Sequence, residues 1–273
     1  MSLFDRRAQI NIGGADFSNL DMVFSVEKDL AGEANSAQFD IYNLNPAHRN
    51  QVKELASNDE KIPVIFKAGY AGNLGQLFTG ELSEGFSRQD GPEWVTTIRS
   101  SDGAKAGGTG RINKTFSAQA TVEAVLKDLA KAVDVGIGNA AEAVKSALMG
   151  GKVSNFTTGV TLSGGGLAHL DHILKSCGLE YSIQDGELQI VPLDEALDSQ
   201  AVVLSAGSGL LGVPEIGSDG IVKARALLIP ELMPGRKVQI DSEHGVSGLF
   251  RVERSVFSGD TAGDDWTVAI EAK

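Results

Sequence analysis

The stretch AQFDIYNLNPAHRNQVKELA, residues 37–56, contains a strand pattern that runs directly into a helix pattern. Phe39 and Ile41, with an alanine before them, alternate with polar residues, which is the period of a strand with one buried face. Asn45 can accept a hydrogen bond from the first helical turn, and Pro46 suits the first helical position, where no backbone donor is needed. The stretch therefore predicts a strand followed at once by a capped helix.

The composition argues against several classes of protein. The chain has 273 residues, of which 42% are apolar, enough for a core and for two or three domains. Its net charge of −12 argues against a surface that grips nucleic acid, which needs clustered Lys and Arg. A single cysteine excludes an internal disulfide framework. No apolar run reaches the roughly 18 residues of a membrane span, and the charged N-terminus does not fit a secretory signal, so we expect no membrane insertion.

The chain changes character twice along its length. Residues 1–105 have mostly strand patterns, and the stretch SDGAKAGGTG at 101–110 has the composition of a linker. Residues 106–198 contain three helical patterns and a hairpin, and residues 199–273 return to strands. We therefore predict a mainly β protein in which two similar β-barrel domains, 1–105 and 199–273, flank a small α/β domain, 106–198.

An internal repeat supports the similarity of the two β segments. Each has a strand that begins with Leu-Phe and ends with Phe-Ser, then a polar turn and Trp-x-x-x-Ile. This order predicts a duplication, with both tryptophans at equivalent core positions and room for a helix only in the first copy. The matched features are Leu77-Phe78 with Leu249-Phe250, Phe86-Ser87 with Phe257-Ser258, Trp94–Ile98 with Trp266–Ile270, Lys61–Ala68 with Arg236–Asp241, and Leu44-Asn45-Pro46 with Leu228-Ile229-Pro230.

The histidines do not form a recognisable metal site. His169 and His172 are three residues apart on one predicted helix, with Asp171 between them. A zinc site needs at least a third ligand, and no other motif supplies it. We therefore interpret this pair as exposed or packing residues, and His48 and His244 as isolated surface residues.

Several short segments resemble parts of phosphate-binding or catalytic motifs, but none completes one. A Gly-rich stretch precedes a predicted helix without Gly-x-Gly-x-x-Gly or a following Lys-Ser/Thr. A Gly-Lys pair is followed by Val153 instead of a hydroxyl residue, and Ala206 takes the place of the first glycine of a nucleophile elbow. Paired acids lie in predicted turns, where solvated carboxylates are ordinary. These segments are Ser163–Gly166, Gly151-Lys152 with Ser146 before it, Ser205–Gly209, Asp264-Asp265 and Asp59-Glu60.

Cys177 ends a predicted helix before Gly178, and we interpret it as a packed small residue. With no motif complete, the sequence predicts no catalytic, cofactor-binding or metal-binding residues, and a protein that is not an enzyme.

Four stretches together resemble a known family. FDIYNLNPAHR (39–49), LLIPELMPG (227–235), RKVQID (236–241) and the closing FRVERSVFSGD (250–260) resemble phage tail baseplate hub proteins of the late-control-protein-D type. The resemblance covers nearly the whole chain. One departure is Ile229, where the family's last-domain pattern has Asn before the proline.

The resemblance implies a structural protein of the virion tail baseplate, assembled in the host cytoplasm. Three subunits, each with two tube-like β-barrels, would form a pseudo-sixfold ring that joins the hexameric tail tube to the threefold central spike. Its partners would be two further copies, the tail tube protein, a spike made as a separate polypeptide, other baseplate proteins and the tape-measure protein. The acidic balance suits a ring that lines a DNA channel without binding the DNA.

Two other functions stay open. The same hub could serve a phage-tail-like secretion system or a pyocin particle, which the sequence does not separate from a phage. A tail-associated cell-wall-binding or hydrolytic protein is the alternative from another class. It would need an aromatic platform or a convergent pair of acids, and neither stands out in the sequence.

Overall fold

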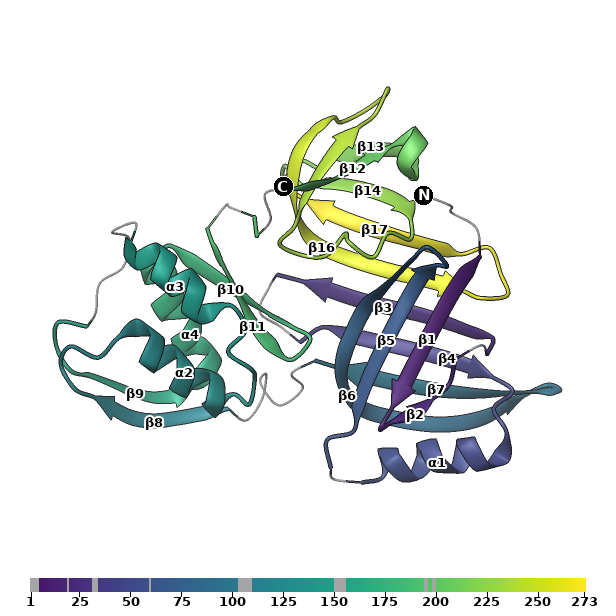
Figure 1. Cartoon of the computed structure of the whole chain (residues 1–273), viewed down its shortest axis with the longest axis horizontal. Coiled ribbons are helices and arrows are strands. Elements are labelled where there is room, and N and C mark those ends of the chain that lie inside the picture. The colour runs from purple at the N-terminus through teal and green to yellow at the C-terminus, as the bar shows by residue number, and fades with distance from the viewer. Residues whose placement is uncertain are drawn as a thin grey trace. The chain divides into compact units, whose positions relative to one another are not determined.

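The computed structural model describes residues 5–18, 20–30, 34–58, 60–102, 110–149, 156–193, 196–197 and 200–273. The chain divides into two compact units. One, the β unit, comprises Met1–Asp29, Asn35–Asp102 and Asp198–Lys273; the other, the α/β unit, comprises Leu30–Ala34 and Gly103–Leu197. The chain is mainly β, and its largest feature is an antiparallel sheet in the β unit (Figure 1).

The β unit holds a 13-stranded sheet. Its order is β13-β14-β17-β16-β3-β4-β7-β6-β5-β1-β2, with β15 pairing both β16 and β12. Neighbouring strands are antiparallel except β12 and β15, which are parallel. The elements are β1 (Arg6–Ile12), β2 (Ala15–Asp16), β3 (Met22–Asp29), β4 (Ser36–Tyr42), α1 (Pro46–Ala56), β5 (Pro63–Tyr70), β6 (Asn73–Asp90), β7 (Glu93–Ser101), β12 (Ala201–Ser205), η1 (Ala206–Ser208), β13 (Leu210–Ile216), β14 (Val222–Leu227), β15 (Lys237–Asp241), β16 (Gly248–Asp260) and β17 (Trp266–Ala272).

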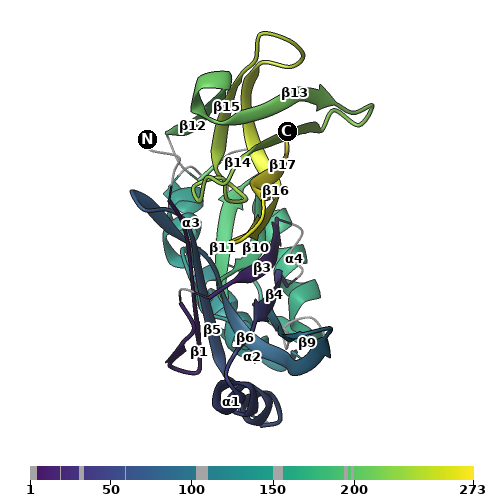
Figure 2. The ribbon, with the colours of Figure 1, turned by 90° about the vertical axis from the view of Figure 1, so that its right-hand side faces the viewer.

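The predicted strand-to-helix corner is confirmed. β4 buries alternate residues and α1 begins at Pro46, where the backbone N–H of His48 donates to the side-chain oxygen of Asn45 over 2.8 Å. Between them Asn43 adopts a left-handed φ of 54° and turns the chain. In Figures 1 and 2, α1 lies beside β6. A Cβ on Gly85 would come within 2.8 Å of Val52, so the glycine allows the helix this close approach.

A single row of cross-strand neighbours organises the core of the β unit. Paired residues of antiparallel strands point to the same face, so a row can be followed across six neighbouring strands, from β6 to β17. Phe24 and Trp266 meet edge to face across Gly259, with ring centroids 5.3 Å apart and planes at 84°. The row reads Gly85, Ile98, Phe39, Phe24, Gly259 and Trp266, one residue each from β6, β7, β4, β3, β16 and β17.

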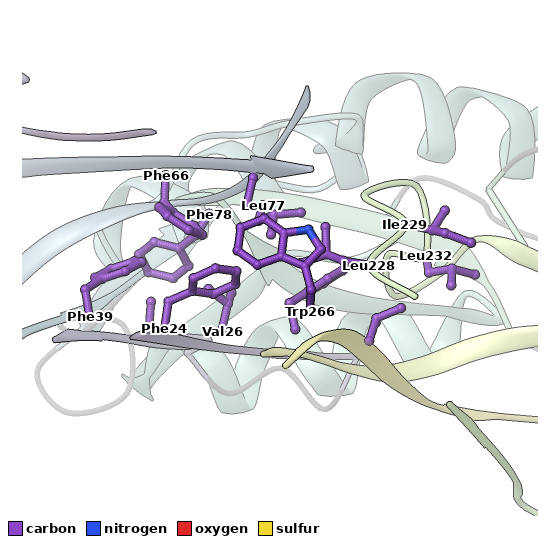
Figure 3. Close-up of a cluster of buried hydrophobic side chains, with 14 of the residues drawn as sticks. Phe24, Val26, Phe39, Phe66, Leu77, Phe78, Leu228, Ile229, Leu232 and Trp266 are labelled. Carbon is purple, nitrogen blue, oxygen red and sulfur yellow. The ribbon is translucent and has the colours of Figure 1, made fainter. Parts of the chain in front are cut away.

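Both β segments contribute to one continuous hydrophobic core (Figure 3). Phe66 of β5 lies 4.7 Å from the ring centroids of both Phe24 and Phe39. Leu228 and Leu232, which follow β14, are buried in the same cluster as these rings. The division into β-domains of 1–105 and 199–273 stays a prediction, although the two segments share this core.

The predicted repeat appears in the topology. Adding ten to each strand number of β3-β4-β7-β6-β5 gives β13-β14-β17-β16-β15, which is the order found in the second half. Both halves have a register shift at the matching place, between Leu82 and Glu84 in β6 and between Val252 and Arg254 in β16. No helix follows β14 among the described residues, so α1 distinguishes the first half, as the sequence suggested.

The proposed equivalence of Leu44-Asn45-Pro46 with Leu228-Ile229-Pro230 needs a shift of one residue. The N–H of Asn43 donates to the carbonyl of Trp94, and the N–H of Leu228 donates to the carbonyl of Trp266. These matching hydrogen bonds align Asn43 with Leu228, so the prolines do not coincide.

The expectation that both tryptophans are core residues is wrong for Trp94. Trp266 is fully buried, whereas Trp94 is only partly buried and lies outside the core cluster. Trp94 is near the start of β7, at the rim of the sheet, where the guanidinium of Arg49 covers its ring at 3.9 Å from the centroid. The repeat placed Trp94 at the matching position of its hairpin. It could not show that Arg49 of α1, and not apolar core residues, would cover the tryptophan ring.

The α/β unit has its own core, in which residues of all three helices pack with residues of four strands. Thr121 caps α2 as predicted, accepting from the N–H of Ala124 over 3.2 Å. The elements are β8 (Arg111–Phe116), α2 (Val122–Ala132), α3 (Ala140–Met149), β9 (Val160–Gly165), α4 (Gly166–Ser176), β10 (Leu179–Gln184) and β11 (Glu187–Pro192), with β8 pairing β9 and β10 pairing β11.

No pairing among the described strands closes either half into a ring of strands. The coarse expectation of a mainly β chain with an α/β insert is confirmed. The arrangement as two barrels stays a prediction.

The two tryptophans give a first test of this core. Trp266→Ala should lower the free energy of unfolding by about 3–5 kcal/mol, as expected for truncating a large buried aromatic. Trp94→Ala should cost roughly 1 kcal/mol, the order of a cation–π contact near the surface. Urea unfolding followed by circular dichroism measures both, and equal losses would contradict the assignment of Trp94 to the rim.

Gly259 gives a second test of this core, because the packing around it leaves no room for a side chain. A Cβ there would lie 2.4 Å from the ring of Phe24 and 2.8 Å from that of Trp266. Gly259→Ala should therefore destabilise the protein by about 3 kcal/mol, near the upper end for overpacking. Gly72→Ala is the matched control, because a Cβ on Gly72 meets no atom within 4 Å. If both variants unfold at the same urea concentration, the row is not as tightly packed as described.

Candidate functional site

The histidine pair of α4 has other neighbours than a cluster of metal ligands. The ring nitrogen Nε2 of His169 lies 3.2 Å from the carbonyl of Ser163, and Asp171 forms an ion pair with Lys175 over 2.9 Å. Within the described ranges, no group of three or more His, Cys, Asp or Glu residues could hold a metal ion. His48 packs edge to face on Phe17, and His244 lies in an exposed loop.

The Gly-rich stretch before α4 serves packing. Gly166 is buried, and a Cβ there would lie 2.4 Å from Val133 of the turn after α2. Gly164 has a φ of +127°, which favours glycine. Both glycines therefore have a structural reason that needs no bound phosphate.

The remaining motif fragments lie in a turn, a helix, a buried position or on the surface, or lie outside the described residues. Ser208 accepts a hydrogen bond from the N–H of Ser205 over 2.8 Å and donates to the carbonyl of Val203, so it closes the turn at η1. Cys177 is buried, and this burial raises the pKa of its thiol. Ser146 lies in α3 and Glu60 is exposed. The structure does not describe Gly151, Lys152, Val153 and Asp59.

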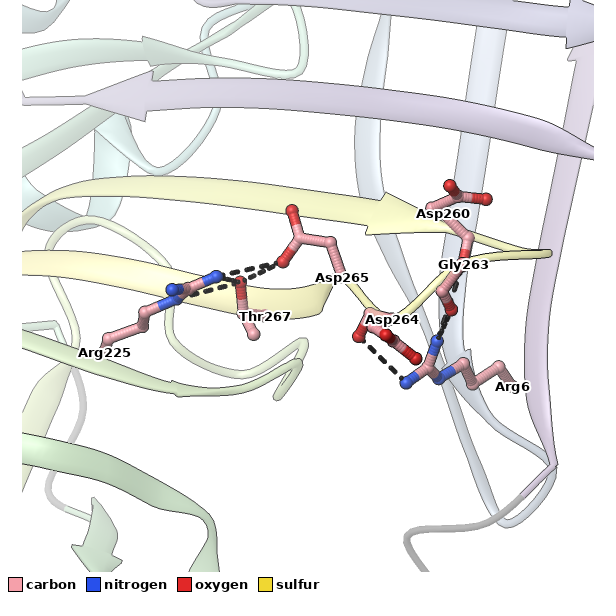
Figure 4. Close-up of polar contacts among 7 residues, drawn as sticks. All are labelled: Arg6, Arg225, Asp260, Gly263, Asp264, Asp265 and Thr267. Carbon is pink, nitrogen blue, oxygen red and sulfur yellow. Dashed lines mark hydrogen bonds and ion pairs between the residues drawn. The ribbon is translucent and has the colours of Figure 1, made fainter.

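The paired acids Asp264-Asp265 belong to a turn that links the two halves of the β unit (Figure 4). The guanidinium of Arg6, from β1, donates to the carbonyls of Gly263 (2.6 Å) and Asp264 (3.1 Å). Asp265 accepts from Arg225 over 3.0 Å and from the hydroxyl of Thr267 over 2.9 Å. These carboxylates therefore do not face each other across a cleft.

The strongest candidate for function is a layer of eight strands, β13-β14-β17-β16-β3-β4-β7-β6, which we call the continuous layer. One face packs on the core. The other, the outward face, carries acids and bases that pair across neighbouring strands. The ion pairs are Arg99 with Glu84 (2.8 Å), Arg254 with Glu27 (3.0 Å), Lys223 with Glu271 (3.4 Å) and Arg225 with Asp265 (3.0 Å).

The outward face is hollowed over the second half. A groove of about 330 Å³ lies over β13, β14, β16 and β17. Its apolar floor includes Val256 and Ala269, and charged residues Lys223, Arg254 and Glu271 border it. The face is therefore a concave surface with interleaved charge.

Both ends of the continuous layer are open edges. Residues 73–81 of β6 pair with β5 and residues 81–90 pair with β7, so the outer edge of residues 82–90 has no partner strand in the described chain. At the opposite end β13 pairs only with β14. Leu211, Val213 and Ile216 on β13 and Phe86 on β6 are exposed at these edges. Unpaired apolar edges of this kind are ready templates for another strand.

Comparison with known proteins identifies the family. The family model described as baseplate hub gp41 matches residues 9–247. The chain belongs to the baseplate hub gp41 family. The resemblance inferred from the sequence is thereby confirmed, and the chain is a phage tail baseplate protein by family. No curated protein sequence matches it.

Solved structures share the fold of this hub-family chain at low sequence identity. The 43 kDa tail protein of prophage MuSo2 from Shewanella oneidensis has a TM-score of 0.67 at 10% identity, covering 98% of this chain and 97% of that one. The tail protein from Neisseria meningitidis MC58 has a TM-score of 0.65 at 12% identity, covering 99% and 97%.

A third structure comes from a secretion system. The E. coli c3393 protein has a TM-score of 0.63 at 12% identity, covering 96% of this chain and 76% of its own. It is described as a component of the type VI secretion system that resembles the T4 tail proteins gp27 and gp5.

Sequence reasoning did not find the open edges. The continuous layer depends on pairing between β16 and β3, more than 200 residues apart, and no local pattern reports such a pairing. The one available signal was Gly212-Val213-Pro214, since Pro within a strand points to an edge or a bulge.

The α/β unit of this hub protein should lose stability in alkali. Burial, with a smaller contribution from the Asp171 carboxylate, raises the pKa of Tyr181 to about 12. Between the unfolded pKa of roughly 10 and this value, the unfolded chain loses a proton that the folded chain keeps, so stability falls as pH rises. Urea midpoints at pH 9 and pH 11 should drop further for the wild type than for Tyr181→Phe. Equal drops would contradict the role of Tyr181.

Proposed function

We propose that this baseplate hub protein forms a homotrimeric, pseudo-sixfold ring that joins the hexameric tail tube to the threefold central spike. The carrying observation is the continuous layer, in which two halves of the same strand order lie in one sheet with an open edge at each end. Three copies would present six similar halves around an axis. Such a ring can match sixfold symmetry on one side and threefold symmetry on the other.

The repeated halves would act as the tube-like barrels of the ring, each completed by its neighbour. A sheet with an even number of antiparallel strands has edge strands that run in opposite directions. The edge of one copy can therefore continue the antiparallel pattern of the next without a break. The helix α1, present only after β4, would distinguish the halves and is the candidate point where threefold character enters.

The outward face would line the DNA channel. Its arginines are held by cross-strand carboxylates, as in Arg99 with Glu84 and Arg254 with Glu27. A guanidinium that is already paired has less to gain from a phosphate. The local pairing, more than the overall net charge, would then let DNA pass without binding.

The other parts of the proposal follow from the family. The chain would act in the virion tail, after assembly in the host cytoplasm, as a structural protein without catalysis. Its partners would be the tail tube protein, a separate spike, other baseplate proteins and the tape-measure protein. The likeness to the E. coli secretion component favours a hub of a tail-like secretion or pyocin particle as the alternative. A cell-wall hydrolase is disfavoured, and peptidoglycan release by the purified chain would revive it.

The trimer is tested by size-exclusion chromatography with light scattering. The purified chain, alone or with its tail tube protein, should give a particle of three times 28.6 kDa. A mass of one chain under both conditions would overturn the ring.

If ion pairs with glutamates keep the outward arginines from binding DNA, removing those glutamates should create DNA binding. Glu27→Gln with Glu84→Gln should free Arg254 and Arg99 and increase retention on DNA-cellulose at low salt. The control, Glu54→Gln with Glu243→Gln, changes the net charge equally at exposed acids without releasing an arginine. Equal retention of the two variants would assign the effect to net charge and contradict the pairing.

A further inference from the structure

The junction between the two halves offers a template for contact between subunits. Inside the chain, β16 of the second half pairs antiparallel with β3 of the first half over seven successive residue pairs, from Arg254 opposite Asp29 to Asp260 opposite Val23. The repeat relates β16 to β6 and β3 to β13. The strands equivalent to this junction are therefore the outer edge of β6 and the outer edge of β13, which are the two open edges of the continuous layer.

The residue register can be transferred from one junction to the other. Trp266 and Trp94 hold matching places, and Ser258 and Arg88 each pair with the residue after the tryptophan, so Ser258 corresponds to Arg88. The match of Phe86-Ser87 with Phe257-Ser258 expected from the sequence is therefore wrong by one residue.

On the other strand, Ser25 lies opposite Gln38 and Glu215 lies opposite Lys223. Phe39 lies opposite Ile98, and Ala224 lies opposite the matching Ile270. Gln38 and Lys223 each precede these residues by one position, so they hold matching places. Ser25 therefore corresponds to Glu215. Because Ser258 lies directly opposite Ser25 inside the chain, Arg88 should lie directly opposite Glu215 between two chains.

We propose that residues 82–90 of β6 in one copy pair antiparallel with β13 of the next copy, with Arg88 opposite Glu215. This inference rests on the proposed ring and names its subunit contact. The junction inside the chain has two serines at this rung, whereas the open edges carry an arginine and a glutamate of opposite charge. Opposite charges directly across an antiparallel pair are favourable.

The two side chains are available for this contact. Arg88 and Glu215 are exposed, and neither forms an ion pair with another residue that the structure describes. This sets Arg88 apart from the neighbouring arginines of the outward face, Arg99 and Arg254, which already have partners.

The bulge in β13 restricts the positions at which another strand could pair with this edge. The register between β13 and β14 shifts between Leu211 and Glu215, so Gly212, Val213 and Pro214 bulge out of the ladder. Pro214 is buried and has no N–H to donate to another strand. Regular pairing with β14 resumes at the next residue, Glu215, which lies opposite Lys223. Such a bulge limits non-specific pairing of the edge and leaves the Glu215 rung as a defined contact.

The contact is head-to-tail, because two different edges meet. Chains carrying Arg88→Cys alone should therefore form a disulfide with chains carrying Glu215→Cys alone, under mild oxidation in a Cys177→Ala background. Residues directly opposite in an antiparallel pair have Cα atoms about 4.5–5.5 Å apart, which suits a disulfide. The product is a dimer band on a non-reducing gel, and neither single variant should give it by itself.

The junction inside the chain provides the matched control. Ser25→Cys with Ser258→Cys should form its disulfide within one chain, which speeds migration without doubling the mass. A second readout is charge reversal, in which Arg88→Glu or Glu215→Arg alone should reduce the trimer fraction about tenfold at a fixed concentration. Mixing the two reversed chains can satisfy only two of the three contacts in a ring of three, so it should restore the trimer only in part. Both reversals in one chain should restore it fully.

The outcomes separate this inference from the ring itself. A trimer that forms normally without the mixed disulfide, or that ignores charge reversal, overturns the β6–β13 register and leaves the ring. A disulfide between two Arg88→Cys chains overturns it in favour of a reciprocal contact. A wild-type chain that stays monomeric with its tail tube protein overturns both.

Discussion

The ladder between β16 and β3 is the interaction on which the β unit depends. It joins two halves that come from opposite ends of the sequence, and it places Phe24 against Trp266 across Gly259. A side chain at Gly259 would force the two rings apart, so this glycine allows the two halves to lie as close as they do. The shared core follows from this contact, because neither half buries all of its apolar residues alone.

The same junction explains why the sheet ends as it does. Each half is open on the side where the other half is attached, and the chain contains only one such attachment. The second pair of edges, on β6 and β13, has no partner strand in the described part of the chain, and in the proposed ring it would pair with another copy. In the proposed ring, the antiparallel contact that β16 and β3 make inside one chain would recur between two chains at β6 and β13. The ion pairs of the outward face join neighbouring strands within the layer. Arg88 and Glu215, on the two edge strands, form no ion pair with another residue that the structure describes.

Family membership and fold agree without implying any active site. His169, Gly166 and Asp265 have structural contacts, as a loop hydrogen bond, a close packing position and an ion pair. The likeness to phage tail proteins and to a secretion component at about 10–12% identity shows that the fold persists while the sequence changes.

The sequence by itself determined the local elements: the corner at Asn45 and Pro46, the cap at Thr121, the mainly β character and the order of the repeat. These depend on residue periodicity and on hydrogen bonds between near neighbours, which the sequence contains directly. Only the tertiary structure decided that Trp94 lies at the rim under Arg49 while Trp266 lies in the core, and that the two halves form one layer with two open edges. Burial and edge exposure depend on which distant strand arrives alongside, and that pairing has no signature in either strand alone.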